Sequence, residues 1–254
     1  SDCTRLSIGI NRTNNKIVGI CLNDFAMCKH FNHFNEFLLP VDLILKLHFH
    51  PEQNYQERTG IKFVPFSPCF PSHDISPWIN YRQDVLNNRS FKHSLIWTGQ
   101  GRIQPVMGIR KSAKNFINSS KYGIAGWLDL ETYFRATCDS IAAVSIHSLG
   151  EFCMRDQEFM GLCIPYIRKE YINTTHNPRF ANVHYFQYSN ITYENIAYFM
   201  NYFEPNGELR QFTNDEWEQY TTIINNAKTW YDDNVSIEGS FKLLLEILQI
   251  NNII

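Results

Sequence analysis

The amino-acid sequence predicts an α/β protein built from two lobes. Short apolar runs rich in β-branched residues alternate with segments of helical periodicity, a pattern that favours parallel sheets covered by helices. Three prolines fall within residues 67–77, SPCFPSHDISP, and such irregular backbone marks a boundary between lobes. A chain of 254 residues is long enough for two cores. We therefore expect a first lobe over residues 1–88, with a linker from about residue 67, and a second over residues 89–254.

The first lobe is predicted to contain four strands and one helix. Two short strands, at 6–10 and 16–22, are separated by a polar turn. A helix is expected after Asp24, where apolar residues recur at three- and four-residue spacing. Buried strands follow at 41–47 and 61–66, so strands and helices alternate as in a parallel sheet.

The second lobe is expected to repeat this alternation. After an amphipathic turn at 78–86, a strand at 94–98 ends in Gly99-Gln100-Gly101-Arg102. The remaining predicted segments are a helix at 110–120, a strand and turn at 121–126, a helix at 129–139 capped by Asp129, a strand ending at 146, a helix at 155–162, strands at 164–167 and 181–185, and helices at 193–203, 213–231 and 236–250.

The stretch 145–168, SIHSLGEFCMRDQEFMGLCIPYIR, combines a strand end, a polar loop, a helix and a second strand. The loop carries His147 and Gly150, and the first helical turn carries Arg155. In an open parallel sheet, ligands bind outside the carboxyl ends of the strands. A helix N-terminus at that edge offers N–H groups and a positive dipole end to an anion. The sequence therefore predicts an anion-binding edge here.

Composition narrows the function classes. A formal net charge of -2 and a pI near 6.5 give no basic face of the kind that tight nucleic-acid binding requires. We find neither an apolar run of membrane-spanning length nor an N-terminal signal pattern. The seven cysteines are scattered without a CxxC pair, which favours a reducing, cytoplasmic location over a disulfide framework or a zinc site. Because the chain opens without Met, we expect a processed chain or one piece of a multidomain protein.

Several catalytic motifs fail on inspection. Gly99-Gln100-Gly101 follows a strand, but Gln104 stands where a dinucleotide fingerprint needs its third glycine. Ser148 lacks the first glycine of a hydrolase elbow, because that position is Ile146. The sequence contains no Asp-x-Asp pair for a metal-bound diphosphate, and Asp129-Leu130-Glu131 is interpreted as a helix cap. Dinucleotide oxidoreductases and serine hydrolases are therefore disfavoured.

One motif remains, beginning at Glu158. Glu158, Cys163 and Pro165 match the pattern Glu-x4-small-x-Pro. A carboxylate in the helix can accept both hydroxyls of a ribose, a small residue lets helix and strand pack closely, and the proline ends the helix. This pattern resembles the donor-binding helix of the two-lobed (GT-B) glycosyltransferases, which carries Glu-Ala-x-x-x-Gly-x-Pro. Here Phe159 replaces the usual alanine and Cys163 the usual glycine.

The resemblance extends over residues 91–254. The segment SLIWTGQGR resembles the first strand and phosphate-facing loop of the donor lobe, and DLETYFRATCDSIAAVSIHS resembles the helix and strand before the donor loop. WYDDNVSIEGSFKLLLEIL resembles the terminal helices that close the fold. The resemblance implies two Rossmann-like lobes, of which the first is a short acceptor-side lobe.

The resemblance also implies an activity. The chain would transfer a sugar from a nucleotide-diphosphate sugar to a hydroxyl of a glycan or other acceptor, without an obligate metal or other cofactor. Asp24 is the first choice for the catalytic base, and the competing residues are His48, His50 and His73. The residues expected to bind the donor are Arg102 and Arg110 at the diphosphate, Glu158 at the ribose, and His147, Gly150 and Arg155 around the donor loop.

Other interpretations stay open. The chain could be a non-catalytic glycan- or nucleotide-binding module, or a nucleotide-sugar epimerase, which shares the two-lobed architecture. Glu158 could instead pair with Arg155 or Arg102 on the surface. Retaining members of several related families carry two glutamates with seven residues between them, whereas Glu151 and Glu158 have six. The sequence therefore leaves the stereochemical outcome open.

Overall fold

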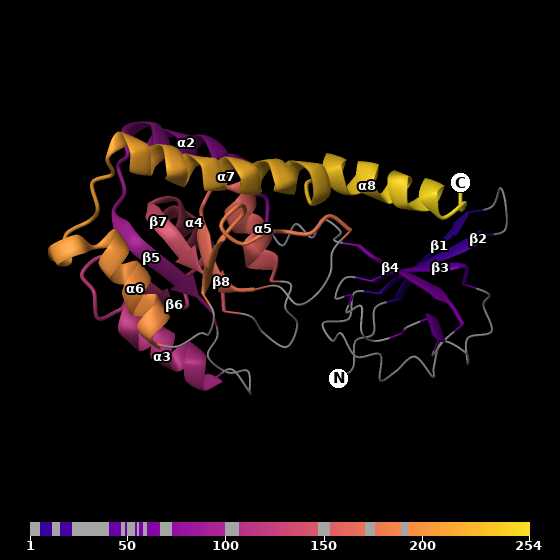
Figure 1. Cartoon of the computed structure of the whole chain (residues 1–254), viewed down its shortest axis with the longest axis horizontal. Helices are drawn as coiled ribbons and strands as arrows, with labels where there is room; N and C mark the ends of the chain where they lie inside the picture. The colour runs from indigo at the N-terminus through magenta and orange to yellow at the C-terminus, as the bar shows by residue number, and fades with distance from the viewer. Residues whose placement is uncertain are drawn as a thin grey trace.

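The computed structural model contains two β-sheets in an α/β arrangement (Figure 1). One sheet is formed near the N-terminus and the other by the remainder of the chain, which confirms the predicted α/β class. The structure describes residues 6–11, 16–21, 41–46, 60–66, 73–99, 107–146, 153–170, 176–188 and 193–254, together with residues 49, 54, 56 and 57.

The first sheet has the strand order β1-β2-β3-β4. β1 runs antiparallel to β2, whereas β2, β3 and β4 are mutually parallel, so that Ile20 lies opposite Leu45 and Leu45 opposite Val64. The helix expected after Asp24 falls outside the described residues. The four strands occupy the predicted places: β1 (Leu6–Asn11), β2 (Lys16–Cys21), β3 (Leu43–Lys46) and β4 (Lys62–Pro65).

The second sheet is parallel throughout and has the order β6-β5-β7-β8-β9. The chain leaves β5 to form β6 on one side, then crosses back to form β7 on the other. The strand order therefore reverses between β5 and β7, which makes their carboxyl ends the topological switch point. The strands are β5 (His93–Thr98), β6 (Ile124–Gly126), β7 (Ser140–Val144), β8 (Tyr166–Lys169) and β9 (Phe186–Tyr188).

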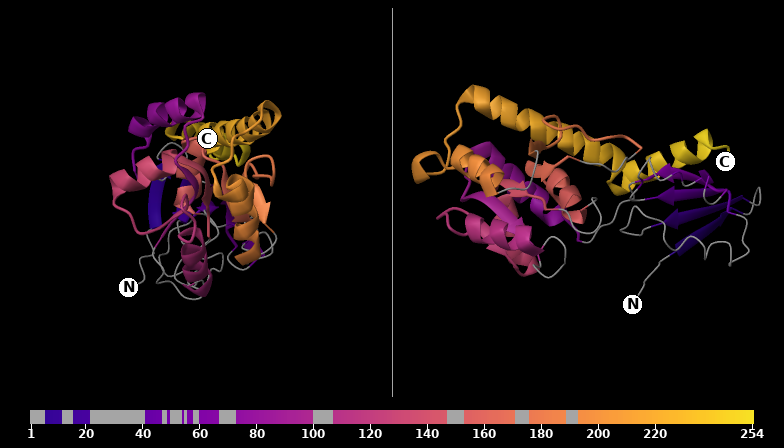
Figure 2. Two further views of the ribbon diagram at one scale, coloured as in Figure 1. Left: turned by 90° about the vertical axis from the view of Figure 1, so that its left-hand side faces the viewer. Right: turned by 60° about the horizontal axis from the view of Figure 1, so that its bottom comes forward.

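Helices cover both faces of this sheet (Figure 2). Alternate residues of β5 enter different cores: Leu95 and Trp97 pack with α3 and α6, whereas Ile96 packs with α4 and α5. The helices are α2 (Ser76–Asn88), α3 (Met107–Ile117), α4 (Leu130–Cys138), α5 (Met154–Gly161), α6 (Tyr193–Phe203), α7 (Asn214–Asn234) and α8 (Ile237–Ile250), with a 3-10 turn at Pro205–Gly207.

Local caps fix several helix starts. The side chain of Asp129 accepts a hydrogen bond from the Thr132 N–H at 3.0 Å, which confirms the cap predicted for α4. At the start of α7, the Glu216 N–H donates to Thr213 Oγ1 and the Thr213 N–H donates to the Glu216 carboxylate. This capping box satisfies two backbone donors and starts the helix at Asn214.

Two predicted elements differ in the structure. The turn expected at 78–86 is part of a thirteen-residue helix, α2, with Pro77 in its first turn, where a proline is well tolerated. The prediction of a strand at 181–185 is wrong, because these residues contain only an isolated bridge between Ala181 and Tyr185. Asn182 adopts a positive φ of 57° and its N–H donates to the Tyr185 carbonyl, so the backbone turns and the strand begins at Phe186.

The C-terminal helix returns to the first sheet (Figure 1). α7 packs on the second sheet, the chain turns at Val235-Ser236, and α8 continues over the first sheet. There, Leu243 and Ile247 share a core with Leu43 and Leu45 of β3. The last helix thus links the two sheets through apolar contacts.

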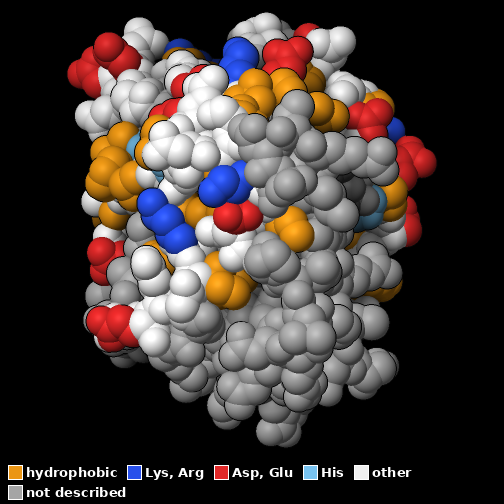
Figure 3. Space-filling view, turned by 90° about the vertical axis from the view of Figure 1, so that its right-hand side faces the viewer, with side chains coloured by type: hydrophobic (Ala, Val, Ile, Leu, Met, Phe, Trp, Pro, Cys, Tyr) orange, Lys and Arg blue, Asp and Glu red, His pale blue; other side chains and the backbone are white. Residues whose placement is uncertain are grey.

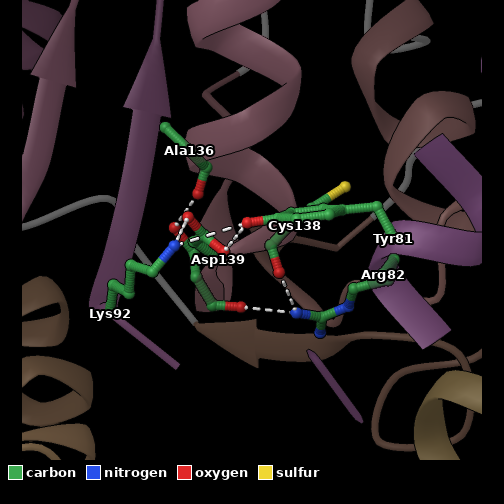
Figure 4. Close-up of polar contacts among 7 residues, drawn as sticks. Tyr81, Arg82, Lys92, Ala136, Cys138 and Asp139 are labelled. Atoms are coloured by element: carbon green, nitrogen blue, oxygen red, sulfur yellow. Dashed lines mark hydrogen bonds and ion pairs between the residues drawn. The ribbon is translucent and has the colours of Figure 1, made fainter. Parts of the chain in front are cut away.

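A buried arginine fastens α2 to the second sheet (Figure 4). Arg82 is 1% exposed, and its Nη1 donates to the carbonyls of Cys138 and Ser140 at 2.6 and 2.9 Å. Its Nη2 donates to the Cys163 carbonyl and to the Tyr220 hydroxyl. Because a buried charge is costly without partners, these bonds make Arg82 a structural clamp between α2, α7 and two loops.

Asp139 lies beside this clamp in the same turn (Figure 4). Its carboxylate accepts hydrogen bonds from the Tyr81 hydroxyl at 2.7 Å and from Lys92 Nζ at 2.8 Å. The pKa of Lys92 is raised, chiefly by its hydrogen bond to Asp139. The pair therefore ties α2 to the start of β5.

The described surface is mixed in character. Seen from the end that carries the first sheet, side chains of both charges lie among hydrophobic ones on the described surface (Figure 3). None of the helices in the described part of the chain is both long enough and apolar enough to cross a bilayer.

Candidate functional site

Two arginines meet at the switch-point edge of the second sheet. Arg110, from α3, is buried, and its Nη2 lies 3.5 Å from the Ile146 carbonyl beyond β7. Arg155, in the first turn of α5, reaches over the end of β5, since a Cβ built on Gly99 would lie 3.3 Å from its Nη1. Two helices, α3 and α5, therefore bring positive charge to the carboxyl ends of β5 and β7.

The two guanidinium groups influence each other. Burial lowers the pKa of Arg110; Cys153 opposes this shift, and the nearby positive charge of Arg155 adds to it. Arg155 is half-buried and has no hydrogen-bond or ion-pair partner among the described residues. A charged group left in this way favours an anionic ligand, because an anion would lower the repulsion and supply the absent hydrogen bonds.

The start of α5 adds to this positive edge. Cys153 occupies the N-cap position and makes no side-chain cap hydrogen bond. The positive end of the helix dipole therefore meets the same edge as the two arginines. Burial raises the pKa of the Cys153 thiol to about 11, with the Asp156 carboxylate adding to the shift, so this cysteine is a neutral thiol near pH 7.

Behind this edge lies a buried ion pair that sequence reasoning did not find. Asp156 is fully buried and accepts from the Arg168 guanidinium of β8 and from the Ser145 hydroxyl. Arg168 Nε also donates to the Lys169 carbonyl at 2.8 Å. Arg168 therefore joins β8 to α5.

Glu158 lies one turn further along α5 and is 7% exposed. One carboxylate oxygen accepts a hydrogen bond from the Tyr133 hydroxyl at 2.6 Å, and the other lies 3.1 Å from His73 Nδ1. Burial and the Glu158 charge raise the pKa of Tyr133 well above its ordinary value. The surface pairing of Glu158 with Arg155 is not observed; the carboxylate is held instead between α4 and the chain entering α2.

A cavity of about 450 Å³ opens beside Glu158. Its walls come from the segment leading into α2, the middle of α5, the end of α7 and the start of α8. The lining residues are His73, Asp74, Ile75, Ser76, Ile79, Gln157, Glu158, Gly161, Lys228, Tyr231, Asp232, Asp233, Ser236, Ile237, Glu238 and Lys242.

The structure brings together Arg110 and Arg155 and places Glu158 on the same helix as Arg155. His73, predicted only as a competing base, is the contact partner of Glu158 across 85 positions of sequence. No local pattern could have revealed that contact. The predicted residues outside the described ranges are Asp24, Arg102, His147 and Gly150, and also His48 and His50.

Within the described residues, no group of three or more His, Cys, Asp and Glu side chains is arranged to hold a metal ion. The fold is a doubly wound α/β fold, and two arginines lie at its switch point. Comparison of the sequence with family models and with curated proteins gave no match.

Proposed function

We propose that the chain is a glycosyltransferase of the two-lobed GT-B type that uses a nucleotide-diphosphate sugar. The observation that carries the proposal is Arg155, a guanidinium with no partner among the described residues, beside Arg110 at the switch point. A diphosphate is an anion of the size and charge that two arginines and a helix N-terminus can bind together.

The course of the chain supports the two-lobed type. The resemblance implies terminal helices that close the fold, and α8 indeed packs against β3 of the first sheet. The cavity beside Glu158 lies along this return path, between α5 and the α7–α8 turn. A ligand at the switch point would therefore lie near the structure that joins the two sheets.

In the proposed mechanism, charge on the departing diphosphate is neutralised by Arg110, Arg155 and the sequence-predicted Arg102. Positive side chains and the α5 dipole would then supply the charge neutralisation that a divalent ion supplies in metal-dependent enzymes. Glu158 would accept the ribose hydroxyls, which requires one oxygen to exchange its His73 contact for the ligand. Asp24 would accept the acceptor proton, with His147 and Gly150 in the donor loop.

The first test is nucleotide binding, measured as the thermal-unfolding midpoint with UDP, GDP, ADP or CMP, each with and without EDTA. We expect one nucleotide diphosphate to raise stability by about 2.7 kcal/mol at roughly a hundred times its Kd, because it binds only the folded state. The shift should survive EDTA. Arg155→Gln should abolish it without lowering the stability of the free protein.

Arg135→Gln provides the matched control. Arg135 is an exposed arginine of α4 that pairs with Glu131, and it lies outside the switch-point edge. Its loss should leave nucleotide binding unchanged. If both variants bind nucleotides like the parent chain, or if no nucleotide shifts the midpoint, the donor site does not lie at this edge.

A second candidate is a nucleotide- or glycan-binding module without turnover. The observation that favours it is the state of Glu158, which is 7% exposed and already has partners on both oxygens. The two candidates differ in product formation. Donor hydrolysis or sugar transfer that Asp24→Asn removes, with binding intact, supports the transferase; selective binding without either product supports the module.

A further inference from the structure

The cavity beside Glu158 has the features of a second ligand site. Its volume of about 450 Å³ lies in the range of small-molecule pockets. Three segments that are distant in sequence, within residues 73–79, 157–161 and 228–242, converge on it, and none of its lining residues is Arg110 or Arg155. It therefore lies apart from the two arginines, although it shares Glu158 of α5 with the proposed donor site.

Gln157 points to a ligand that carries hydrogen-bonding groups. Its side chain belongs to the cavity lining and is only 3% exposed. Nε2 of this amide has no hydrogen-bond partner among the described residues. Because a buried amide donor without an acceptor is costly, a hydroxyl oxygen of a ligand would supply what the chain itself does not.

The charges around the cavity favour a cation. Five carboxylates line it against two lysines. Lys228 is already paired with Asp232 at 2.6 Å, and Asp74 accepts from the Ser76 N–H at 2.9 Å. Asp233 and Glu238, by contrast, have no hydrogen-bond or ion-pair partner among the residues described, and both lie at the α7–α8 turn.

The lining also suits a ring better than a flexible polycation. Tyr231 contributes an aromatic side chain, and Gly161 keeps the wall open, since a Cβ there would lie 3.0 Å from the Tyr231 ring. Aromatic rings accept the apolar face of a saturated ring. Lys242 and Lys228 would repel a second positive charge while donating to ligand hydroxyls.

We propose that this cavity binds an amino sugar. Its hydroxyl oxygens would accept from Gln157, and its protonated amine would pair with Asp233 and Glu238. This proposal goes beyond sugar transfer, because it requires no nucleotide and neither Arg110 nor Arg155.

The test measures the Kd of three sugars for the full chain at matched ionic strength: glucosamine, glucose and glucuronate. Charge-assisted hydrogen bonds are stronger than neutral ones, so glucosamine should bind roughly tenfold more tightly than glucose, and glucuronate more weakly than either. Spermidine, a cation without a ring, should bind more weakly than glucosamine.

Variants locate the site. Gln157→Met keeps the side-chain volume and should weaken glucosamine and glucose alike, by roughly fivefold. Asp233→Asn and Glu238→Gln should each reduce the preference for glucosamine and leave glucose binding unchanged. Gln249→Met, the same substitution at an exposed position of α8 outside the cavity, should leave the Kd of each sugar unchanged. Arg155→Gln, which should abolish nucleotide binding, should leave these sugar Kd values unchanged as well.

Several results would overturn the proposal. These are equal Kd values for glucosamine and glucose, tighter binding of glucuronate or spermidine, and an unchanged affinity in Gln157→Met. The absence of binding by all three sugars would also overturn it. Because nucleotide binding depends on Arg155 and sugar binding does not, failure here is distinguishable from failure of the proposed function.

Discussion

Arg82 and Arg168 have the same chemistry as Arg155 at the switch point but different surroundings. Arg82 and Arg168 are 1% and 2% exposed, and each donates to several groups of the chain itself. Arg155 is half-buried and has no hydrogen-bond or ion-pair partner in the described ranges. The supply of partners within the chain therefore separates a structural charge from a candidate ligand-binding one, because a buried ion must be satisfied from within.

The largest change in stability is expected on removing Arg168. We expect Arg168→Met to lower the free energy of unfolding by about 4 kcal/mol, because it leaves Asp156 as an uncompensated buried charge. Urea denaturation measures the change. Arg155→Met, the matched substitution, should stay within about 0.5 kcal/mol of the parent chain.

A rescue variant separates charge from packing. Adding Asp156→Asn to Arg168→Met removes the uncompensated charge and should recover part of the lost stability. A loss for Arg155→Met as large as that for Arg168→Met would mean that the two arginines share a structural role.

The next largest effect is expected at the joint between α5 and α7. A Cβ on Gly161 would lie 2.5 Å from Ile75 Cδ1 and 3.0 Å from the Tyr231 ring. Gly161→Ala should therefore destabilise the chain by about 1 to 3 kcal/mol through overpacking. Gly108→Ala is the control, because a Cβ there would meet no atom of another described segment within 4 Å. Equal thermal-unfolding midpoints for Gly161→Ala and Gly108→Ala would show that the packing between α5 and α7 can relax.

A smaller effect concerns Glu158, a carboxylate that has partners within the chain and is also proposed to bind the ligand. Glu158 has partners, but one of them, His73, is 39% exposed at its side chain and can move away. If the ribose replaces this contact, His73→Ala should tighten nucleotide binding by up to roughly fivefold, the value of one hydrogen bond. Calorimetric titration of the parent chain and the variant measures this. Weaker binding in His73→Ala would show that the histidine contacts the ligand instead.

The smallest effect is a pH dependence in the first sheet. The pKa of Asp42 is lowered, chiefly by the hydrogen bond from the Ile17 N–H and also by Lys16. Because the folded-state pKa is the lower one, this stabilisation is present above the unfolded pKa and is lost as pH falls through the folded value. The free energy of unfolding should therefore decline below about pH 4, and less steeply in Asp42→Asn. An identical decline in both chains would assign the effect to other groups.

Local signals predicted much of the fold. The Asp129 cap of α4 could be predicted because a cap and its target are three residues apart. Apolar β-branched runs located β3 and β7, since a buried strand needs apolar side chains on both faces. The strand expected at 181–185 failed because Asn182 turns the backbone, a choice that the apolar pattern does not encode.

The candidate site was predictable only in part. The position of Arg155 in the first turn of α5 follows from the loop and helix around it, and the structure places it by the end of β5 as that argument requires. The cavity could not be predicted, because Gln157 and Asp233 line the same space only when α5 packs on α7.

The sequence by itself determined the α/β class, the places of most strands and helices, and the gathering of charged residues at one loop. These properties depend on spacings of two to four residues, which the chain encodes locally. Three features depend on tertiary packing: which arginines have hydrogen-bond and ion-pair partners within the chain, the contact of His73 with Glu158, and the return of α8 to the first sheet. Such contacts join residues far apart in the chain, so they depend on the packing of whole elements and leave no local signature.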